Sequence, residues 1–165
     1  MKISVAMAYY NGGMYIEEQM DTILTQLGAQ DEVIVSVDGA SDGSKPLLFK
    51  MAEEDKRIHI IKGPGKGVVK NFENAIRHCS GEIIYLSDED DIWKPDKVKK
   101  VNEAFLNPKV KAVLHDAQIV DECGNPTGAE GLFANRGSRK GILKNLVKNS
   151  YVGCCMAFRR ELIPV

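Results

Sequence analysis

Apolar residues follow two alternating patterns along the first part of the chain. Runs that are apolar almost throughout and rich in strand formers predict four strands, at Lys2–Tyr9, Glu32–Val37, Arg57–Lys62 and Glu82–Ser87. Between the first two runs, apolar residues recur at the three- and four-residue steps of one helical face. These positions are Ile16, Met20, Ile23, Leu24 and Leu27.

Three further helices are expected after the second, third and fourth strands. Ser44 precedes an apolar stripe as an N-cap residue would, and Gly81 follows the next stripe as a C′ glycine would. The fourth helix is expected over Pro95–Phe105. The stripes of the middle two helices comprise Leu47, Leu48, Met51 and Ala52, then Val69, Phe72, Ile76 and Cys79.

This order of elements predicts the fold class. Strands that are apolar on both faces and separated by helices are typical of a parallel sheet covered on both sides. We therefore expect an α/β, Rossmann-like, mostly parallel sheet with helices on both faces. In the less regular remainder we expect strands at Val110–His115 and Val152–Arg159, a long loop at Gly124–Arg139 and a short helix at Leu143–Lys148.

Length, charge and cysteine spacing narrow the class of protein. A chain of 165 residues with 44% hydrophobic residues fits one globular domain. Its net charge of −1 argues against a general nucleic-acid binder, which carries a basic excess. No apolar run approaches the ~20 residues that span a bilayer, and the four cysteines form no CxxC pair. We expect a soluble, cytoplasmic protein without a transmembrane segment.

Polar residues follow the predicted strands at the edge where parallel sheets bind ligands. Tyr10–Gly13 come after the first strand, Asp38 after the second and the acidic run Asp88–Asp91 after the fourth. Four adjacent carboxylates repel one another, which raises a pKa or requires a cation. Mg²⁺ and Mn²⁺ take oxygen ligands and commonly bridge carboxylates to substrate phosphates. The sequence therefore indicates a nucleotide and a divalent ion in one crevice.

A structural role is the alternative for these residues. Negative charge before the Pro95 helix complements the helix dipole, and Asp42 and Ser44 suit an ordinary turn and cap. The position of Asp38 favours a ligand-binding role over a structural one, because Asp38 is expected to share the crevice with the acidic run. Other motifs do not fit: Gly63–Gly67 lacks the Walker spacing, and the sequence has no GxGxxG, EF-hand or GxSxG pattern.

Six segments, in order along the chain, carry a family resemblance. They are Ile3–Gly12 (ISVAMAYYNG), Val35–Ser44 (VSVDGASDGS), Gly67–Ile76 (GVVKNFENAI), Leu86–Pro95 (LSDEDDIWKP), His115–Asn125 (HDAQIVDECGN) and Gly153–Arg160 (GCCMAFRR). Together they resemble the inverting family 2 glycosyltransferases of the GT-A fold, especially the bacterial rhamnosyltransferase-like branch. The LSDEDDIWKP segment is quite specific, and the combination covers essentially the whole chain.

The resemblance implies a role for several residues. Asp38 matches the family's base-binding carboxylate, and Asp88 and Asp90 match its DxD-type motif, which holds Mn²⁺ or Mg²⁺. Asp90 would be the main metal ligand, with Asp88 nearer the ribose or the metal. Lys66 would reach a phosphate, with a solvated loop lysine as the alternative. The loop that cradles the base and ribose would contain Ala8, Tyr10 and Asn11.

Three departures from the family pattern stand out. Val37 replaces an acidic residue before Asp38, and Tyr9 stands where a small or hydroxyl residue is common, so base packing is expected to differ. The branch also carries its general base in an acidic, Trp-containing segment after the GCCMAFRR strand. Because the sequence stops at Val165 without such a segment, we expect an N-terminal fragment of the enzyme. Asp116, which matches the region facing the sugar and the acceptor, is the candidate base within it.

The resemblance implies glycosyl transfer on a single GT-A domain, with a nucleotide-binding half at 1–106 and the start of an acceptor half at 107–165. The donor would be a UDP- or dTDP-sugar and the acceptor a polysaccharide or lipid-linked glycan, near the inner face of the plasma membrane. Two alternatives stay open. One is a nucleotide-binding domain without turnover. The other is a sugar-1-phosphate nucleotidyltransferase, although Tyr9–Gly12 does not match the Gly-rich, Arg-containing loop of those enzymes.

Overall fold

The computed structural model describes residues 1–39, 41–121, 124–127, 131 and 153–164. In this part of the chain, six strands form one sheet: β1 (Ile3–Tyr9), β2 (Glu32–Val37), β3 (Ile58–Lys62), β4 (Ile83–Ser87), β5 (Ala112–Leu114) and β6 (Met156–Arg159). The helices are α1 (Ile16–Leu24), α2 (Lys45–Glu54), α3 (Val68–His78) and α4 (Lys97–Phe105), with short 3₁₀ helices η1 (Gly153–Cys155) and η2 (Arg160–Leu162). The predicted alternation of strands and helices is confirmed.

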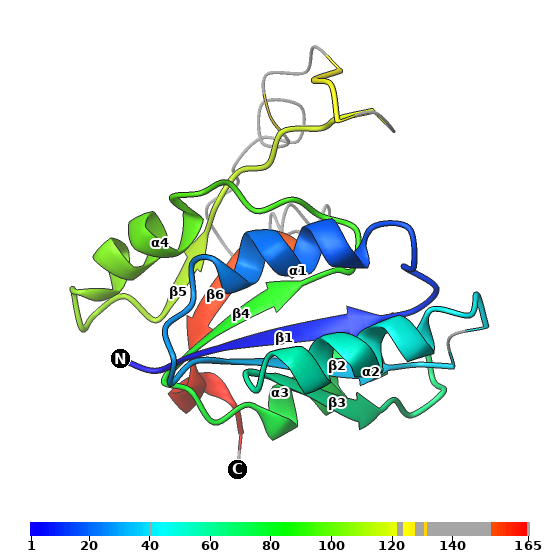
Figure 1. The fold of residues 1–165 in the computed structure, drawn as a ribbon. Helices are drawn as coiled ribbons and strands as arrows, with labels where there is room; N and C mark the ends of the chain where they lie inside the picture. The colour runs from blue at the N-terminus through cyan, green and yellow to red at the C-terminus, as the bar shows by residue number, and fades with distance from the viewer. Residues whose placement is uncertain (40, 122–123, 128–130, 132–152, 165) are drawn as a thin grey trace.

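The sheet has the order β3-β2-β1-β4-β6-β5 (Figure 1). β1 pairs in parallel with β2 and β4, and β2 pairs in parallel with β3. β6 runs antiparallel to both β4 and β5. The expected α/β class with a mostly parallel sheet is therefore confirmed, with an antiparallel edge formed by the last two strands.

Helices cover both faces of the sheet, as predicted. On one face Val5 and Met7 of β1 pack with buried residues of α1, α2 and α4. On the other face Ala6 packs with α3 through Ala75 and Cys79. Alternate residues of a strand point to opposite faces, so a central strand buried on both sides is apolar nearly throughout. All seven residues of β1 are buried, which explains its continuous apolar run.

Several element ends differ from the sequence prediction. The last helix begins at Lys97 rather than Pro95, and Leu27 lies beyond the end of α1 although it is buried. Val69 is 71% exposed, so its assignment to the apolar stripe of α3 is wrong. The buried residues of α3 are Asn71 and Ala75, and a polar residue on the buried side hides the true face from a search for apolar periodicity.

Gly81 has a different role from the predicted helix cap. α3 ends at His78, and Cys79 is already extended, with φ −68° and ψ 135°. A Cβ on Gly81 would lie 2.6 Å from Ser4 N and 2.7 Å from Ile3 C. Glycine is required at this position because two backbones approach closely, not because the chain adopts a left-handed conformation.

The C-terminal part of the sheet is shorter than predicted. The expected strand at Val110–His115 is reduced to β5. The expected strand at Val152–Arg159 is partly wrong, because Gly153–Cys155 form η1 and only β6 pairs in the sheet. The predicted loop at Gly124–Arg139 lies largely outside the described residues, and the predicted helix at Leu143–Lys148 lies wholly outside them.

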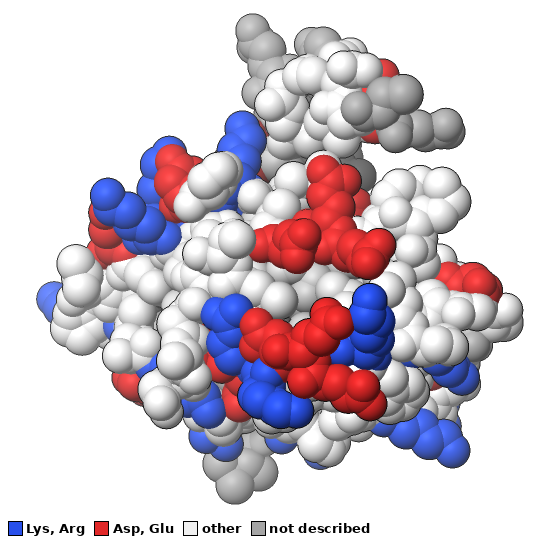
Figure 2. Space-filling model, viewed as in Figure 1, with Lys and Arg blue, Asp and Glu red and all other residues white. Residues whose placement is uncertain are grey.

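The surface carries charge of both signs. Figure 2 shows Asp and Glu side chains gathered over α1, whereas those over α2 are flanked by Lys or Arg. The face in this view has no continuous basic area, in keeping with the balanced charge of the sequence. None of the helices in the described ranges has the length and apolar character needed to cross a membrane.

Candidate functional site

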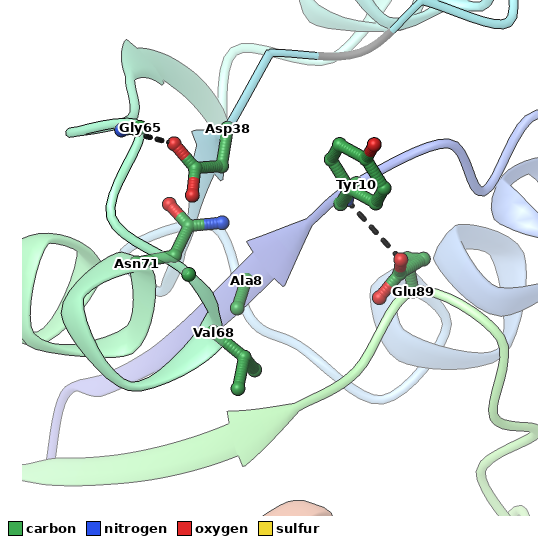
Figure 3. A pocket seen from close by; sticks show the side chains of 8 residues that line it. Ala8, Tyr10, Asp38, Gly65, Val68, Asn71 and Glu89 are labelled. Atoms are coloured by element: carbon green, nitrogen blue, oxygen red, sulfur yellow. Dashed lines mark hydrogen bonds between the residues drawn. The ribbon is translucent and has the colours of Figure 1, made fainter.

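A cavity of about 490 Å³ opens at the carboxyl ends of β1 and β2, where the loop before α3 and the acidic run after β4 converge (Figure 3). This is the edge at which open parallel sheets bind ligands. The structure brings together three residues that the sequence predicts, Ala8, Tyr10 and Asp38. The other lining residues are Gly65, Gly67, Val68, Asn71 and Glu89.

Asp38 is held in place by backbone hydrogen bonds. Its own N–H donates to Tyr9 O at 2.9 Å, which fixes the residue beside the end of β1. Gly65 N–H donates to Asp38 Oδ1, so the loop before α3 fixes the carboxylate. Asp38 is only 9% exposed. The side chain therefore presents an oriented acceptor to the cavity, as base recognition requires.

Tyr10 and Asn11 form the turn after β1. Tyr10 N–H donates to Glu89 Oε1 at 3.1 Å, and the Tyr10 ring is 58% exposed beside the cavity. Asn11 has φ 57°, a left-handed conformation that asparagine tolerates better than most residues. Its Oδ1 accepts from Ser41 N–H at 2.7 Å, which joins this turn to the loop after β2. Asn11 thus shapes the turn and does not line the cavity.

Tyr9 does not line the cavity, and its expected effect on the packing of a base stays a prediction. Its side chain is fully buried in the core, and its hydroxyl donates to Ser44 Oγ at 2.5 Å. Ser44 occupies the N-cap position of α2, but its hydroxyl donates to Asp42 instead of capping the helix. Asp42 also accepts from Gly13 N–H at 3.0 Å. These contacts fasten the first βα turn to the start of α2.

The acidic run lies beside η1, and three of its four residues are partly buried. Ligand atoms of Asp88, Asp91 and Cys154 all lie within 4.8 Å of one another. Burial and the charges of Asp91 and Asp90 raise the pKa of Asp88 to about 6. The two carboxylates suit Mg²⁺ or Mn²⁺, and the thiol adds a softer ligand. Asp90, predicted as the main ligand, is exposed and stands outside this group.

A lysine lies next to the acidic group. Lys97 Nζ lies 3.8 Å from the centroid of the Trp93 ring and donates to Cys154 O at 3.4 Å. Burial lowers the pKa of Lys97 to about 8, partly offset by the nearby charge of Asp91. This cation reduces the repulsion between the carboxylates. Sequence analysis missed Lys97, although it is the second residue after the LSDEDDIWKP segment.

Two predicted residues lie away from the cavity wall. Lys66 is exposed in the loop between Gly65 and Gly67, and it does not line the cavity. Asp116 is exposed beyond β5, where its Oδ1 accepts from Ala117 N–H at 2.9 Å. The roles of Lys66 toward a phosphate and of Asp116 as a base stay predictions.

Sequence analysis also missed Asn71 and Glu89 as lining residues. Asn71 is 2% exposed, and its Nδ2 donates to Tyr9 O at 3.3 Å. The signal was a polar residue four positions after Gly67, in a segment already noted for its family resemblance. Glu89 belongs to the acidic run, but only the structure shows that it turns toward Tyr10 and away from Asp91's group.

The sheet order, with a cavity at the carboxyl edge of the sheet, defines an α/β protein of the GT-A type. The chain belongs to glycosyltransferase family 2: the model of the family "Glycosyl transferase family 2" matches residues 4–164. A putative teichuronic acid biosynthesis glycosyltransferase, TuaG of Bacillus subtilis, is 32% identical over 127 residues, which cover 75% of this chain and 50% of TuaG. An uncharacterised glycosyltransferase of Nostoc is 30% identical over 122 residues, which cover 73% of this chain and 38% of that protein.

Solved structures show the same fold. A mannosyltransferase of Pyrobaculum calidifontis, in complex with GDP-Man and Mn²⁺, matches 97% of this chain and 45% of its own with a TM-score of 0.69 and 23% identity. TarS 1–349 of S. aureus, in complex with UDP-GlcNAc, matches 98% of this chain and 46% of its own with a TM-score of 0.69 and 20% identity. The chain thus spans half or less of the length of each of these relatives and structures.

Proposed function

We propose that this chain forms the donor-binding part of a glycosyltransferase that moves a sugar from a nucleotide-diphospho-sugar onto a hydroxyl of a polysaccharide or lipid-linked glycan. One observation carries the proposal: Asp38, from the loop after β2, and Glu89, from the acidic run after β4, line the same cavity at the carboxyl edge of the sheet. A base held by Asp38 would direct its diphosphate toward the acidic run. Inversion at the sugar and dependence on Mn²⁺ or Mg²⁺ belong to this proposal.

The position of each residue assigns it a role in this proposal. The Tyr10 ring offers a stacking surface for the base, and the Asp38 carboxylate accepts from a base N–H. Asp88, with Asp90 or Asp91, would hold the divalent ion, which when bound supplies positive charge to the leaving diphosphate. The acceptor oxygen attacks the anomeric carbon opposite the leaving group and gives up its proton. Asp116 is our candidate for the carboxylate that takes this proton.

The names of the relatives support the acceptor class. TuaG is named for teichuronic acid biosynthesis, and an Escherichia coli relative 27% identical over 154 residues is named a glucosyltransferase acting on a diphosphoundecaprenol-linked sugar. These names support our proposal of a bacterial polysaccharide or lipid-linked acceptor, and we place the reaction at the cytoplasmic face of the membrane as part of it. The name of the glucosyltransferase also supports a hexosyl group as the sugar that is transferred.

Calorimetric titration of nucleoside diphosphates into the chain, with and without Mn²⁺, tests the proposal. Binding should require Mn²⁺ or strengthen with it, and Asp90→Ala should remove this dependence if Asp90 is the main ligand. Asp88→Ala and Asp91→Ala decide which pair holds the ion. Asp21→Ala, an exposed carboxylate on α1, is the matched control and should behave as the wild type. No binding of any nucleoside diphosphate with Mn²⁺ would contradict the proposal.

A further inference from the structure

Asn71 carries a buried hydrogen-bond acceptor that has no partner in the described part of the chain. The residue lies in the first part of α3 and is 2% exposed, and its Nδ2 donates to Tyr9 O at 3.3 Å. Its Oδ1 is buried and accepts no hydrogen bond from any described residue. Figure 3 shows the side chain pointing toward Asp38, with this oxygen beside the Asp38 carboxylate. Buried polar atoms are normally paired, so this oxygen indicates a missing donor.

Rotating the amide does not supply that donor. The exchanged orientation would turn Nδ2 toward Asp38 and leave Oδ1 facing Tyr9 O, which is also an acceptor. In either orientation one acceptor faces another. Gly65 N–H, which lies nearby, already donates to Asp38 Oδ1. A ligand in the cavity can supply this donor.

The side chains around the cavity offer acceptors more than donors. Asp38 and Glu89 contribute carboxylate oxygens, Asn71 contributes Oδ1, and Ala8 and Val68 are apolar. The Nδ2 of Asn71 is already used by Tyr9 O. A base that fits these walls carries adjacent N–H donors on one edge.

The geometry points to guanine as the base that Asp38 and Asn71 recognise together. This inference rests on the proposed function, in which the cavity holds the base of a sugar nucleotide. Guanine N1–H and one N2–H would donate to Asp38, and the second N2–H would donate to Asn71 Oδ1. Asn71 is then a specificity-determining residue for the donor.

The other bases fit this pair of acceptors less well. Uracil and thymine, which the sequence resemblance implies, carry one N–H between two carbonyl oxygens, and one of those oxygens would face Asn71 Oδ1. Adenine and cytosine place a bare ring nitrogen beside their amino group, and that nitrogen would face Asp38. An unmade hydrogen bond in a buried site weakens binding strongly, so the pair discriminates between bases.

Titration of GDP, IDP and UDP in the presence of Mn²⁺ tests this inference atom by atom. IDP keeps guanine N1–H and lacks only the 2-amino group. The wild-type chain should bind GDP about a hundredfold more tightly than IDP, because IDP loses the N2 hydrogen bonds to both Asp38 and Asn71 Oδ1, each worth about tenfold. UDP should bind more weakly than GDP. In Asn71→Ala the ratio of GDP to IDP affinity should fall about tenfold, as in a double-mutant cycle, because only the N2 hydrogen bond to Asp38 remains.

Asn74→Ala is the matched control on the same helix. Asn74 lies one turn further on and donates to Ser36 Oγ at 2.8 Å and Lys62 O at 3.0 Å, outside the cavity lining. It should keep the wild-type ratio of GDP to IDP affinity.

The outcomes separate this inference from the proposed function. Tighter binding of UDP than GDP, or equal binding of GDP and IDP by the wild type, would overturn guanine recognition and leave the proposed function intact. Failure of all three nucleotides to bind would overturn the proposed function itself. A loss in Asn71→Ala that is the same for GDP and IDP would assign Asn71 a structural role only. If Asn71→Ala does not fold, the wild-type ratio still decides.

Discussion

The fold shifts the pKa values of two carboxylates, Glu32 and Asp88, in opposite directions. Glu32 is buried at the start of β2, which alone would raise its pKa. Hydrogen bonds from Ser4 Oγ at 2.5 Å, Ser80 N–H at 2.6 Å and Lys2 Nζ at 3.1 Å outweigh that effect and lower the pKa to about 2. Within the described residues Asp88 receives no comparable set of hydrogen bonds, and burial raises its pKa to about 6. The two residues therefore have opposite effects on stability as pH changes.

Glu32→Gln should destabilise the fold at neutral pH by about 2 kcal/mol. Because the folded-state pKa lies below the ordinary 4.5, the stabilisation from Glu32 is complete above pH 4.5 and disappears as pH falls toward 2. Urea unfolding at several pH values measures this as a difference that shrinks in acid. Glu53→Gln, an exposed change on α2, is the control. A difference between wild type and Glu32→Gln that stays constant from pH 7 to pH 3 would contradict the prediction.

Asp88→Asn should stabilise the fold when no divalent ion is present, whereas Glu32→Gln destabilises it. The raised pKa means that the charged form is disfavoured in the folded state, so Asp88 costs stability above pH 6 and nothing below its ordinary value of 3.8. The variant should gain about 1 kcal/mol at pH 7, allowing for partial exposure, and nothing at pH 3.5. Adding Mn²⁺ should reverse the order, because only the wild type keeps the ligand. A gain that persists at pH 3.5 would point to another cause.

At the scale of elements, the sequence predicts the helices and strands whose positions depend on apolar periodicity and on turn residues. All four parallel strands and the four long helices follow from apolar spacing, because burial on both faces leaves a direct trace in the sequence. Close contacts between backbones leave no such trace in the sequence. Gly81 was predicted to be a helix cap, but glycine is needed there because its backbone passes close to Ile3 and Ser4 of β1. Asn71 was missed for a related reason, since its side chain donates to Tyr9 O at the end of β1, a contact distant in sequence. Asp38 and the acidic run could be placed because strand ends share one edge of the sheet.

Gly63 directly follows β3, and its backbone lies against the backbone of Val37 and Asp38. A Cβ at this position would lie 2.7 Å from Val37 O and 2.8 Å from both Asp38 N and Asp38 Cα. Gly63→Ala should therefore displace Asp38, weaken nucleotide binding about tenfold and cost roughly 1–3 kcal/mol of stability. Calorimetry and urea unfolding measure the two effects.

Two other glycines serve as controls for Gly63→Ala. Gly81→Ala should destabilise the fold by a similar amount through its contact with Ser4 and Ile3, yet leave the nucleotide affinity of the folded protein unchanged. Gly28→Ala, where a Cβ would meet only Asp31 Oδ2 at 3.4 Å, should change neither quantity by much. Equal nucleotide affinity in Gly63→Ala and Gly28→Ala would show that Asp38 does not depend on this close approach.

At the scale of the whole molecule, the site unites parts that are distant in sequence. Tyr10, Asp38, Asn71 and Glu89 come from four segments that only the sheet order β3-β2-β1-β4 brings together. A ligand that contacts all four segments binds the folded state and not the unfolded chain. Its binding free energy is therefore added to the stability of the entire fold.

Nucleotide and Mn²⁺ together should raise the melting temperature of the chain. At a ligand concentration of 100 times Kd the stabilisation is about 2.7 kcal/mol, which corresponds to roughly 5–10 °C for a domain of this size. Asp38→Asn should abolish most of this shift, because the carboxylate that accepts from the base is lost, while Asp21→Asn on α1 should keep it. Differential scanning calorimetry measures both variants beside the wild type. A full shift in Asp38→Asn would place the nucleotide elsewhere than in the cavity at the carboxyl edge of the sheet.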